Sequence, residues 1–215
     1  MVVSVVGGHG QIALVLTGLL ALDGISVRSL IRNPDHADAV SEAGGSPVVV
    51  DFEVAPDEEI DAAIAGSNVV VFAAGAGPGS GVERKESVDY GAAVRLIEAA
   101  RRNGSPRYVM ISAVRADPEY PGDDVFSVYL RAKGRADAKL LGSGLDHLIL
   151  RPVGLTDDPA ASRISLVREV DRLESDTVPR ADVAAVLAEA IVHHPEASGI
   201  WNLSSGELPV TRAFA

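Results

Sequence analysis

The 215-residue chain contains no cysteine, and this absence excludes several kinds of chemistry at once. Disulfide scaffolds, thiolate zinc sites and cysteine nucleophiles all need a thiol that the sequence does not supply. Positive charge is also scarce, because 19 Lys and Arg stand against 30 Asp and Glu and leave a formal net charge of −11. Such a surface repels phosphate backbones and anionic lipid, so we expect no nucleic-acid partner and no membrane partner.

Long hydrophobic runs are missing as well. The stretch that comes nearest to one, Ile12–Leu22, is about half as long as a transmembrane helix requires. The first positive charge is Arg28, so the basic segment that opens a secretory signal is absent. We therefore expect a soluble, cytoplasmic protein. With 47% apolar and 23% charged residues, the chain has the composition of a globular domain.

Short β-branched segments alternate with helical stretches over the first 150 residues. Apolar residues recur at helical spacing over Ile12–Leu20 and Val88–Ala99. Strands that are apolar without alternation are buried on both faces, as in a parallel sheet covered by helices. The β-α order predicts an α/β fold with a doubly wound parallel sheet, the Rossmann fold. The predicted strands are Val2–Val6, Ile25–Ile31, Pro47–Asp51, Asn68–Ala73, Arg107–Ser112 and His147–Leu150.

After Arg151 the pattern is less regular. A polar loop is predicted at Thr156–Ser162, a short strand at Arg163–Val170, a helix at Ala181–His194 and a last strand at Ile200–Leu203. This part is too short for an independent domain. We expect residues 1–215 to form a single domain in which residues 151–215 provide a lid and one wall of a substrate cleft.

A glycine-rich turn, Val-Val-Gly-Gly-His-Gly-Gln-Ile-Ala over residues 5–13, joins the first predicted strand to the first helix. Gly7 allows a tight turn, Gly10 lets the backbone approach a pyrophosphate, and Ala13 permits close helix–sheet packing. The helix N-terminus offers N–H groups and a positive dipole end to phosphates. A turn of this kind that binds nothing is the alternative. We predict a dinucleotide held by Gly7, Gly8, His9, Gly10, Gln11 and Ile12.

The end of the second strand bears on which dinucleotide binds. An NAD enzyme usually places an acid there for the ribose 2′-hydroxyl, whereas an arginine pairs with a 2′-phosphate. The sequence has Arg32 and no acid, which favours NADP over NAD; a solvated arginine is the alternative. Asp51 could contact the adenine amino group or cap a turn.

Small residues follow the fourth predicted strand. Ala73, Ala74 and Gly75 would let a cofactor's sugar–phosphate lie against the backbone, although a plain turn would look the same. We also expect Phe52, Pro152 and Val153 to contact the cofactor.

Three residues predict an acid–base centre. Tyr129 and Lys133 are spaced i, i+4 on one helix face, and Ser112 ends the fifth strand at the same edge of the cleft. An ammonium near the phenol favours the phenolate and lowers its pKa, so the pair could exchange a proton with a carbonyl or alcohol oxygen that Ser112 orients. A purely structural helix pair is the alternative. His193 and His194 point roughly 100° apart on a helix, so we expect no metal.

The ordered set of motifs resembles the atypical short-chain dehydrogenases/reductases, nearest to the NmrA-like NAD(P)H-binding proteins related to biliverdin and flavin reductases. This resemblance implies a Rossmann sheet, usually NADP, and contact of Lys133 with the nicotinamide ribose. Ala73 differs from the asparagine that many of these proteins carry. The motifs are Gly7-x-x-Gly10-x-x-Ala13 and the segments 30–34, 69–75, 107–112, 143–146, 150–152, 156–159 and 178–184.

The leading hypothesis is an NADP(H)-dependent oxidoreductase that transfers hydride to a small carbonyl, quinone or flavin-like acceptor, with the protein a monomer or homodimer. A second hypothesis is a non-catalytic NADP(H) binder that senses redox state. A third is a nucleotide-sugar epimerase, which uses the same Tyr and Lys chemistry but usually needs a longer chain.

Overall fold

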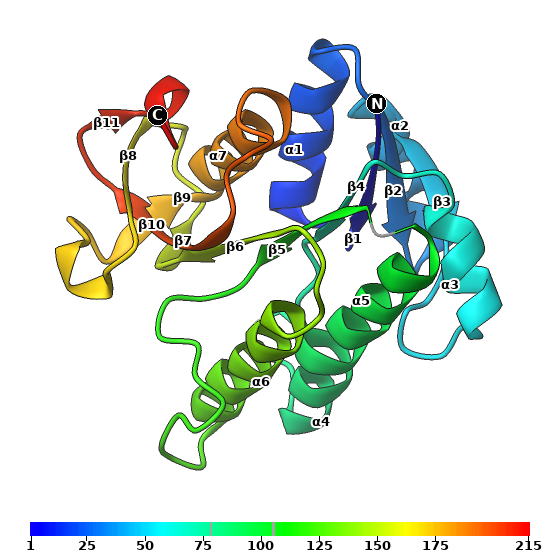
Figure 1. Cartoon of the computed structure of the whole chain (residues 1–215), viewed down its shortest axis with the longest axis horizontal. Coiled ribbons are helices and arrows are strands. Elements are labelled where there is room, and N and C mark those ends of the chain that lie inside the picture. Colours follow the sequence, from blue (N-terminus) through cyan, green and yellow to red (C-terminus); the bar gives the residue numbers. More distant parts are fainter. Residues whose placement is uncertain (78, 105) are drawn as a thin grey trace.

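The computed structural model describes residues 1–77, 79–104 and 106–215. Within them, one nine-stranded sheet runs through the molecule in the order β11-β8-β10-β6-β5-β4-β1-β2-β3 (Figure 1). The pairs from β10 to β3 are parallel, and β8 and β11 extend the sheet as antiparallel strands. The strands are β1 Val2–Val6, β2 Ser26–Ile31, β3 Ser46–Val49, β4 Val69–Phe72, β5 Arg107–Ile111, β6 His147–Pro152, β8 Arg163–Val167, β10 Gly199–Ser205 and β11 Leu208–Pro209.

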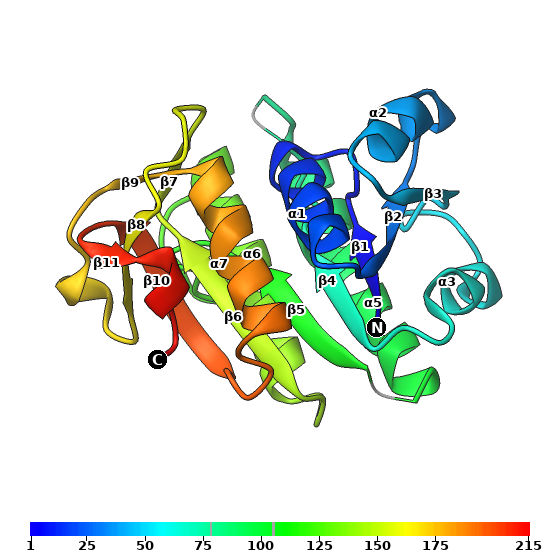
Figure 2. The ribbon, with the colours of Figure 1, turned by 90° about the horizontal axis from the view of Figure 1, so that it is seen from above.

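Helices cover both faces of the sheet, which confirms the predicted doubly wound α/β fold (Figure 2). On one face α1 (Gln11–Leu22) packs against α7 (Arg180–Val192), and the short α2 (Ala37–Glu42) lies beside α1. On the other face α5 (Ala93–Arg102) lies between α3 (Asp57–Ile64) and α6 (Val125–Leu141). A short helix α4 (Val82–Arg84) and a π-helical segment η2 (Lys85–Ala92) lead into α5.

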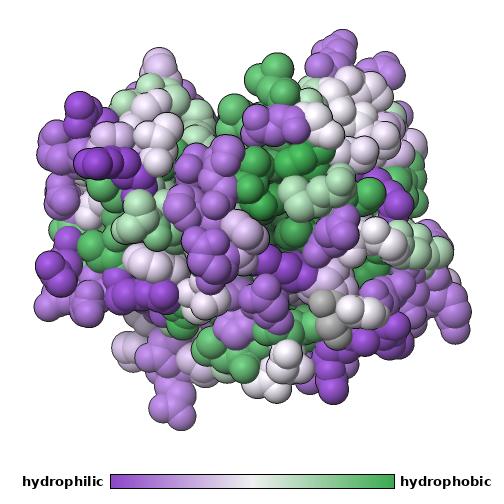
Figure 3. Space-filling model, turned by 45° about the horizontal axis from the view of Figure 1, so that its top comes forward, coloured by the Kyte–Doolittle hydropathy of each residue, from purple (hydrophilic) through white to green (hydrophobic). Residues whose placement is uncertain are grey.

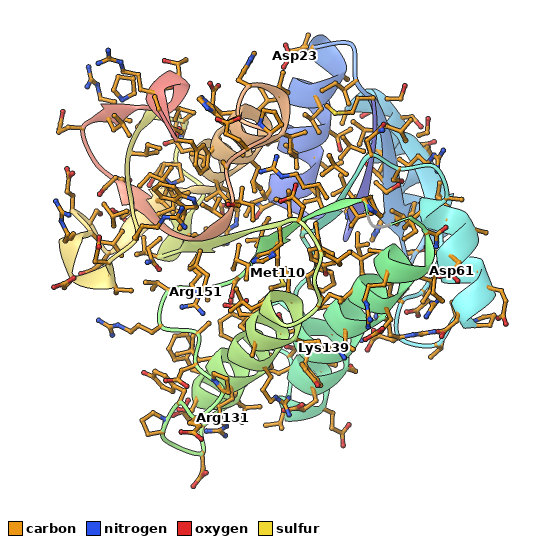
Figure 4. All side chains as sticks on the ribbon, viewed as in Figure 1. Asp23, Asp61, Met110, Arg131, Lys139 and Arg151 are labelled. Atoms are coloured by element: carbon orange, nitrogen blue, oxygen red, sulfur yellow. The ribbon has the colours of Figure 1, made fainter. Side chains whose placement is uncertain are left out.

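Alternate residues of the central strands fill two separate cores. Val71 and Val109 belong to the core under α1 and α7, whereas Phe72 and Met110 belong to the core under α5 and α6. Met110 lies between the sheet and the latter helices in Figure 4. All four are fully buried, and burying such a side chain contributes about 1.5–3 kcal/mol. The central strands are therefore held from both sides, as their uninterrupted apolar sequences predict.

The order of the strands reverses between β1 and β4. From β1 the sheet runs outward through β2 to β3, and from β4 it runs the other way through β5 to β6. Ligands of such sheets bind outside the carboxyl ends of the strands at this point. The Gly7–Gly10 turn follows β1 and the small residues 73–75 follow β4, so both predicted cofactor segments lie at the reversal point.

The C-terminal part differs in detail from the prediction. The strand predicted over Arg163–Val170 ends at Val167, and a 3-10 turn, η3 (Val170–Arg172), occupies its last residue. The predicted loop Thr156–Ser162 begins inside a strand, because β7 (Gly154–Thr156) pairs with β9 (Thr177–Pro179) in a second, two-stranded sheet. Strands of three residues carry no detectable periodicity, which is why the sequence did not predict them.

Polar side chains cover most of the face seen in Figure 3, and apolar residues gather near its middle. No helix among the described residues is long and apolar enough to cross a membrane.

Candidate functional site

The glycine-rich turn has the geometry that its sequence predicts. Gly7 adopts a φ of +79°, which a residue with a side chain rarely tolerates. A Cβ on Gly7 would lie 2.7 Å from the Cα of Ala74, and a Cβ on Gly8 would lie 2.6 Å from the Cβ of Ser29. The two glycines are needed for packing of the turn against the strands, whereas a Cβ on Gly10 would meet only backbone oxygens, the nearer at 3.2 Å.

The start of α1 fits an anionic ligand. The first helical hydrogen bond runs from Leu14 N to Gly10 O at 2.9 Å, so the N–H groups of Gln11 and Ile12 point out of the helix end. Gly10 is the N-cap, and no described side chain caps the helix or places an acid in its first turn. The side chain of Ile12 is buried in the core, so Ile12 could contact a phosphate only through its N–H. Together these features could accommodate a phosphate, and we call this part of the molecule the phosphate cradle.

A cavity of about 160 Å³ opens beside the turn. It is lined by Gly7 and Leu30 on one side and by Asp51, Phe52 and Gly75 on the other. The side chain of Asp51 accepts a hydrogen bond from Glu53 N at 2.9 Å, so it caps the turn after β3. Phe52 is buried in the core under α5. The cavity suits a flat heterocycle of the size of adenine.

Arg32 also lines this cavity, but it is already paired. Its guanidinium lies 3.0 Å from a carboxylate oxygen of Glu53, and Arg84 approaches the same oxygen at 3.1 Å. Ser87 donates a hydrogen bond to the other oxygen of Glu53 at 2.6 Å. Two arginines therefore share one carboxylate at the mouth of the cavity. The sequence analysis missed Glu53 and Arg84, since neither lies in a recognisable motif.

Lys133 is buried beneath the small residues that follow β4. Its ammonium donates hydrogen bonds to Ile111 O at 3.2 Å and to Ala74 O at 3.4 Å, and it lies 3.3 Å from Asp89 Oδ1. Burial alone would lower the pKa of Lys133, but Asp89, with Tyr129 and Asp137, outweighs it and raises that pKa. Lys133 therefore stays charged.

Asp89 comes from the π-helical segment η2, and the sequence analysis missed it. Its Oδ2 accepts a hydrogen bond from Ala76 N at 3.3 Å. Its Oδ1 faces the Lys133 ammonium but accepts no hydrogen bond of good geometry from the described residues. The attraction between Asp89 and Lys133 is therefore one of opposite charges rather than a directed hydrogen bond. π-Helical turns are frequent at functional sites. The sequence does contain a signal for Asp89, because an acid stands next to Val88 on the helical face that Val88 and Ala92 bury.

Tyr129 lies between two of the three lysines. The Lys85 ammonium is 5.4 Å and the Lys133 ammonium 6.0 Å from the centre of its ring. The sequence predicts a lowered pKa for Tyr129, and this prediction is wrong, because the sum of all effects raises that pKa. Burial raises the pKa of the phenol, and although Lys133 acts to lower it, Asp89 and Asp137 add to the rise. Tyr129 is thus a phenol, not a phenolate, at neutral pH.

Ser112 is linked to the same helix through Asp137. The Ser112 hydroxyl donates to Asp137 Oδ2 at 2.9 Å, and Arg151 approaches that oxygen at 2.7 Å. Arg151 reaches from β6 toward α6 (Figure 4). Burial raises the pKa of Asp137, while Arg151 and Ser112 oppose that rise. Asp137 follows Lys133 by one helical turn, a spacing that the sequence analysis did not use.

A second cavity, of about 440 Å³, is lined by Val114 and Arg115, which follow β5, while Ser112 and Tyr129 are not among the lining residues described. Val114 and Leu130 form part of its apolar wall, and Phe126, one turn before Leu130 on α6, completes it. Val153 after β6 lines the cavity, whereas Pro152 is buried at the end of that strand. The opposite side comes from Val170 and residues 173–176, with Glu174 and Asp176 among them.

Similar proteins place these features in a family. The chain matches the NAD(P)H-binding family over residues 7–194. It is 30% identical to the Bacillus subtilis protein YhfK, described as an uncharacterized sugar epimerase, over 100% of this chain and 99% of that one. A Bacillus halodurans structure classed as an NAD-dependent epimerase/dehydratase is 30% identical, with a TM-score of 0.90 and coverage of 99% and 97%.

A third likeness concerns the fold alone. The anaerobilin reductase ChuY of Escherichia coli O157:H7 superposes with a TM-score of 0.79 at 22% identity and covers 97% of this chain and 98% of its own. The family match spans both the phosphate cradle and the segment that carries Tyr129 and Lys133. The chain belongs to the NAD(P)H-binding family of Rossmann-fold proteins.

Proposed function

We propose that the protein is an NADPH-dependent oxidoreductase of the NmrA-like branch of the short-chain dehydrogenases/reductases, acting on a small carbonyl, quinone or flavin-like acceptor. One chain of contacts carries this proposal. Lys133 donates to the carbonyl oxygen of Ala74, and the Cα of Ala74 packs directly against Gly7 of the phosphate turn. Ala74 therefore connects the proposed acid–base pair to the proposed cofactor cradle, since it contacts both Lys133 and Gly7.

The described residues supply suitable donors for each part of a dinucleotide. The N–H groups of Gln11 and Ile12, with Gly8, His9 and Gly10 beside them, would surround the pyrophosphate. Arg32 and Arg84 would meet a 2′-phosphate, and the cavity at Asp51 and Phe52 would take adenine. On the nicotinamide side, the proposed contacts are Ala73, Ala74, Gly75, Lys133, Pro152 and Val153. The bound NADPH would supply the hydride.

Proton transfer would fall to Tyr129. Because burial keeps its phenol protonated, Tyr129 can donate a proton to the oxygen of an acceptor as that oxygen gains negative charge. The charged ammonium of Lys133, 6.0 Å from the ring, would stabilise the phenolate left behind. Ser112 would orient the acceptor oxygen, and its bond to Asp137 fixes where its hydroxyl lies.

The second cavity would hold the acceptor. We propose that residues 1–215 act as one domain and that residues 151–215 form the cleft wall and lid, since Val153, Val170 and residues 173–176 supply one side of this cavity. Its walls combine apolar side chains with two carboxylates, and Arg115 is the one basic residue against Glu174 and Asp176 among the lining residues described.

The same lining disfavours a sugar-epimerase activity, the activity in the description of the Bacillus subtilis relative. A nucleotide-sugar epimerase must hold a diphosphate, and a site with more carboxylates than guanidinium groups would repel it. A non-catalytic redox sensor is the second candidate function, because the ion pair between Lys133 and Asp89 would also suit a purely structural buried pair.

The test is oxidation of NADPH by the full chain with a panel of aldehydes, quinones and flavins, run in parallel with Tyr129→Phe. Turnover that depends on Tyr129 supports the proposed reductase. Tight NADPH binding without turnover on any acceptor supports the sensor instead.

A further inference from the structure

Two histidines from different strand ends form a stacked pair beside the phosphate cradle. His9 lies in the turn after β1, and His36 ends the 3-10 turn η1 (Pro34–His36) after β2. Their ring centres are 3.6 Å apart and their planes are inclined by 14°. Both residues are half-buried. The pair therefore joins the segment that cradles the pyrophosphate to the segment that carries Arg32.

The surroundings of the stack disfavour positive charge while no anion is bound. Burial lowers the pKa of His9, and His36 lowers it further because two imidazolium rings face to face repel each other. The positive end of α1, which begins two residues after His9, acts in the same direction. Without a ligand, His9 is thus a neutral ring at neutral pH.

Few other charges act on the pair. The charged groups on the neighbouring elements are Arg32 after β2, Asp35 within η1, and Asp38 and Glu42 at the two ends of α2. Arg32 is paired with Glu53, and the Gly7–Gly10 turn contains no charged side chain. The turn after β4, residues 73–77, also contains none. A phosphate bound in the cradle would therefore be the dominant new charge near His9.

We propose that His9 and His36 form a proton-linked phosphate clamp, in which binding of the dinucleotide's phosphate at the start of α1 draws one proton from solution onto the stacked pair. This inference rests on the proposed NADP(H) site. The protonated ring donates a charge-assisted hydrogen bond to a phosphate oxygen, and the neutral ring of the pair keeps it in place by stacking.

The direction of the pH dependence follows from linkage. Binding raises the proton affinity of the pair, so dinucleotide affinity increases as pH falls through the window between the bound-state and free-state titrations. The free state of His9 titrates below the ordinary histidine value of about 6.5, so the window opens below that value, and the clamp requires the bound-state titration to lie above neutral pH. Uptake of one proton corresponds to about a tenfold gain in affinity per pH unit.

The test is calorimetric titration of the full chain with NADPH and with NADH, in pairs of non-phosphate buffers that differ in ionisation enthalpy, from pH 6 to 8. We expect up to one proton taken up per NADPH near pH 7. His9→Gln and His36→Gln should lose this uptake and should weaken binding several-fold more at pH 6 than at pH 8. His147→Gln is the matched control, because His147 begins β6 at the amino edge of the sheet, and it should behave as the parent does.

The two dinucleotides distinguish which phosphate is clamped. Proton uptake on binding of both NADPH and NADH would show that the histidine pair holds the pyrophosphate. Proton uptake on binding of NADPH alone would show that it holds the 2′-phosphate. The 2′-phosphate itself titrates near pH 6 and releases protons on binding, so the quantity compared is the difference between parent and variant. Titration of the histidine ring resonances of the parent by NMR, with and without NADPH, gives the same answer without a variant.

The outcomes separate the clamp from the function. NADPH binding with the same proton uptake in the parent and both variants would overturn the clamp and leave the proposed function standing. Absence of binding by either dinucleotide would overturn both.

Discussion

The ammonium of Lys133 lies 3.3 Å from the carboxylate of Asp89, and both side chains are almost completely buried. Burying one charge alone costs several kcal/mol, so each group is tolerated because the other is present. The carbonyl oxygens of Ala74 and Ile111 take the remaining hydrogens of the ammonium. Lys133 therefore keeps a fixed position and a full charge next to the ring of Tyr129.

Asp89→Asn should destabilise the protein strongly, by about 3–5 kcal/mol, because it leaves the Lys133 ammonium buried without its counter-charge. The pair between Glu86 and Arg135 is the matched control, since it involves the same two elements but is substantially exposed. Glu86→Gln should cost no more than about 1 kcal/mol. Urea unfolding at neutral pH measures both. Equal unfolding curves for Asp89→Asn and the parent would contradict the role given to this pair.

The same pair fixes a pH dependence of stability. The pKa of Lys133 is higher in the folded chain than in the unfolded one, so its contribution is complete below the unfolded value of about 10.4 and is lost as pH rises through the folded value. We expect the parent to lose stability above about pH 10.4, and Lys133→Met to lose less over the same range. Urea unfolding from pH 8 to 11 shows this difference.

Gly10→Val should abolish dinucleotide binding and leave the fold intact. Its branched side chain would occupy the space in front of the α1 N-terminus, where the nearest atom to a Cβ is Gly7 O at 3.2 Å. Gly8→Ala is the contrasting variant, because its Cβ would meet the backbone of Ser29 and the fold must shift. Thermal unfolding and NADPH titration of both variants separate the two roles. Normal NADPH binding by Gly10→Val would show that the cofactor binds elsewhere.

Sequence periodicity could predict the fold because the central strands are buried on both faces. Val69–Phe72 and Arg107–Ile111 appear as uninterrupted apolar segments for that reason. The short strands β7, β9 and β11 could not be found, since two or three residues show no period. The phosphate turn was predictable because its glycines are set by local geometry, as the positive φ of Gly7 shows.

The electrostatics of the site could not be predicted in the same way. The spacing of Tyr129 and Lys133 is local, but the partner of Lys133 is a carboxylate that comes from a segment more than forty residues earlier. Burial of Tyr129 depends on how α6 packs, and that burial reverses the expected direction of its pKa. Glu53, which pairs with Arg32 and lies in no recognisable motif, is a third case.

Arg32→Ala should reduce the preference for NADPH over NADH. A charge-assisted contact between arginine and phosphate contributes about 1.5–3 kcal/mol, which corresponds to roughly ten- to a hundredfold in affinity. Arg28→Ala is the control, because that arginine lies on β2, the strand that Arg32 follows, but donates to Ala65 O at the end of α3. Calorimetry with both dinucleotides tests this. Equal affinities of the parent for NADPH and NADH would contradict the assignment of Arg32.

Glu53→Gln should have the opposite effect. Glu53 holds Arg32 and Arg84 and would also repel a 2′-phosphate, so removing its charge should strengthen NADPH binding while NADH binding changes little. A parallel loss of affinity for NADPH would instead show that Glu53 is needed to position the arginines.

The pH profile of reduction reports on Tyr129. A general acid must be protonated, and the pKa of this phenol is above its ordinary value of about 10. We expect turnover to be independent of the ionisation of Tyr129 at neutral pH and to decline only above about pH 10. In the direction of alcohol oxidation the phenolate is required, so turnover should increase with pH over the same range. Steady-state kinetics in both directions would show these opposite slopes.

The most direct test of the proposed chemistry is the steady-state kinetics of Tyr129→Phe on whichever acceptor the parent reduces. The variant removes one hydroxyl and keeps the ring between Lys85 and Lys133, so NADPH affinity should be unchanged. Turnover should fall by about 10²–10⁴, the usual contribution of a positioned acid. Tyr120→Phe, in the loop before α6, should match the parent. Lys133→Met should weaken NADPH binding as well as turnover. Unchanged turnover in Tyr129→Phe would contradict the acid–base role and favour the sensor or a reductase that needs no proton from this residue.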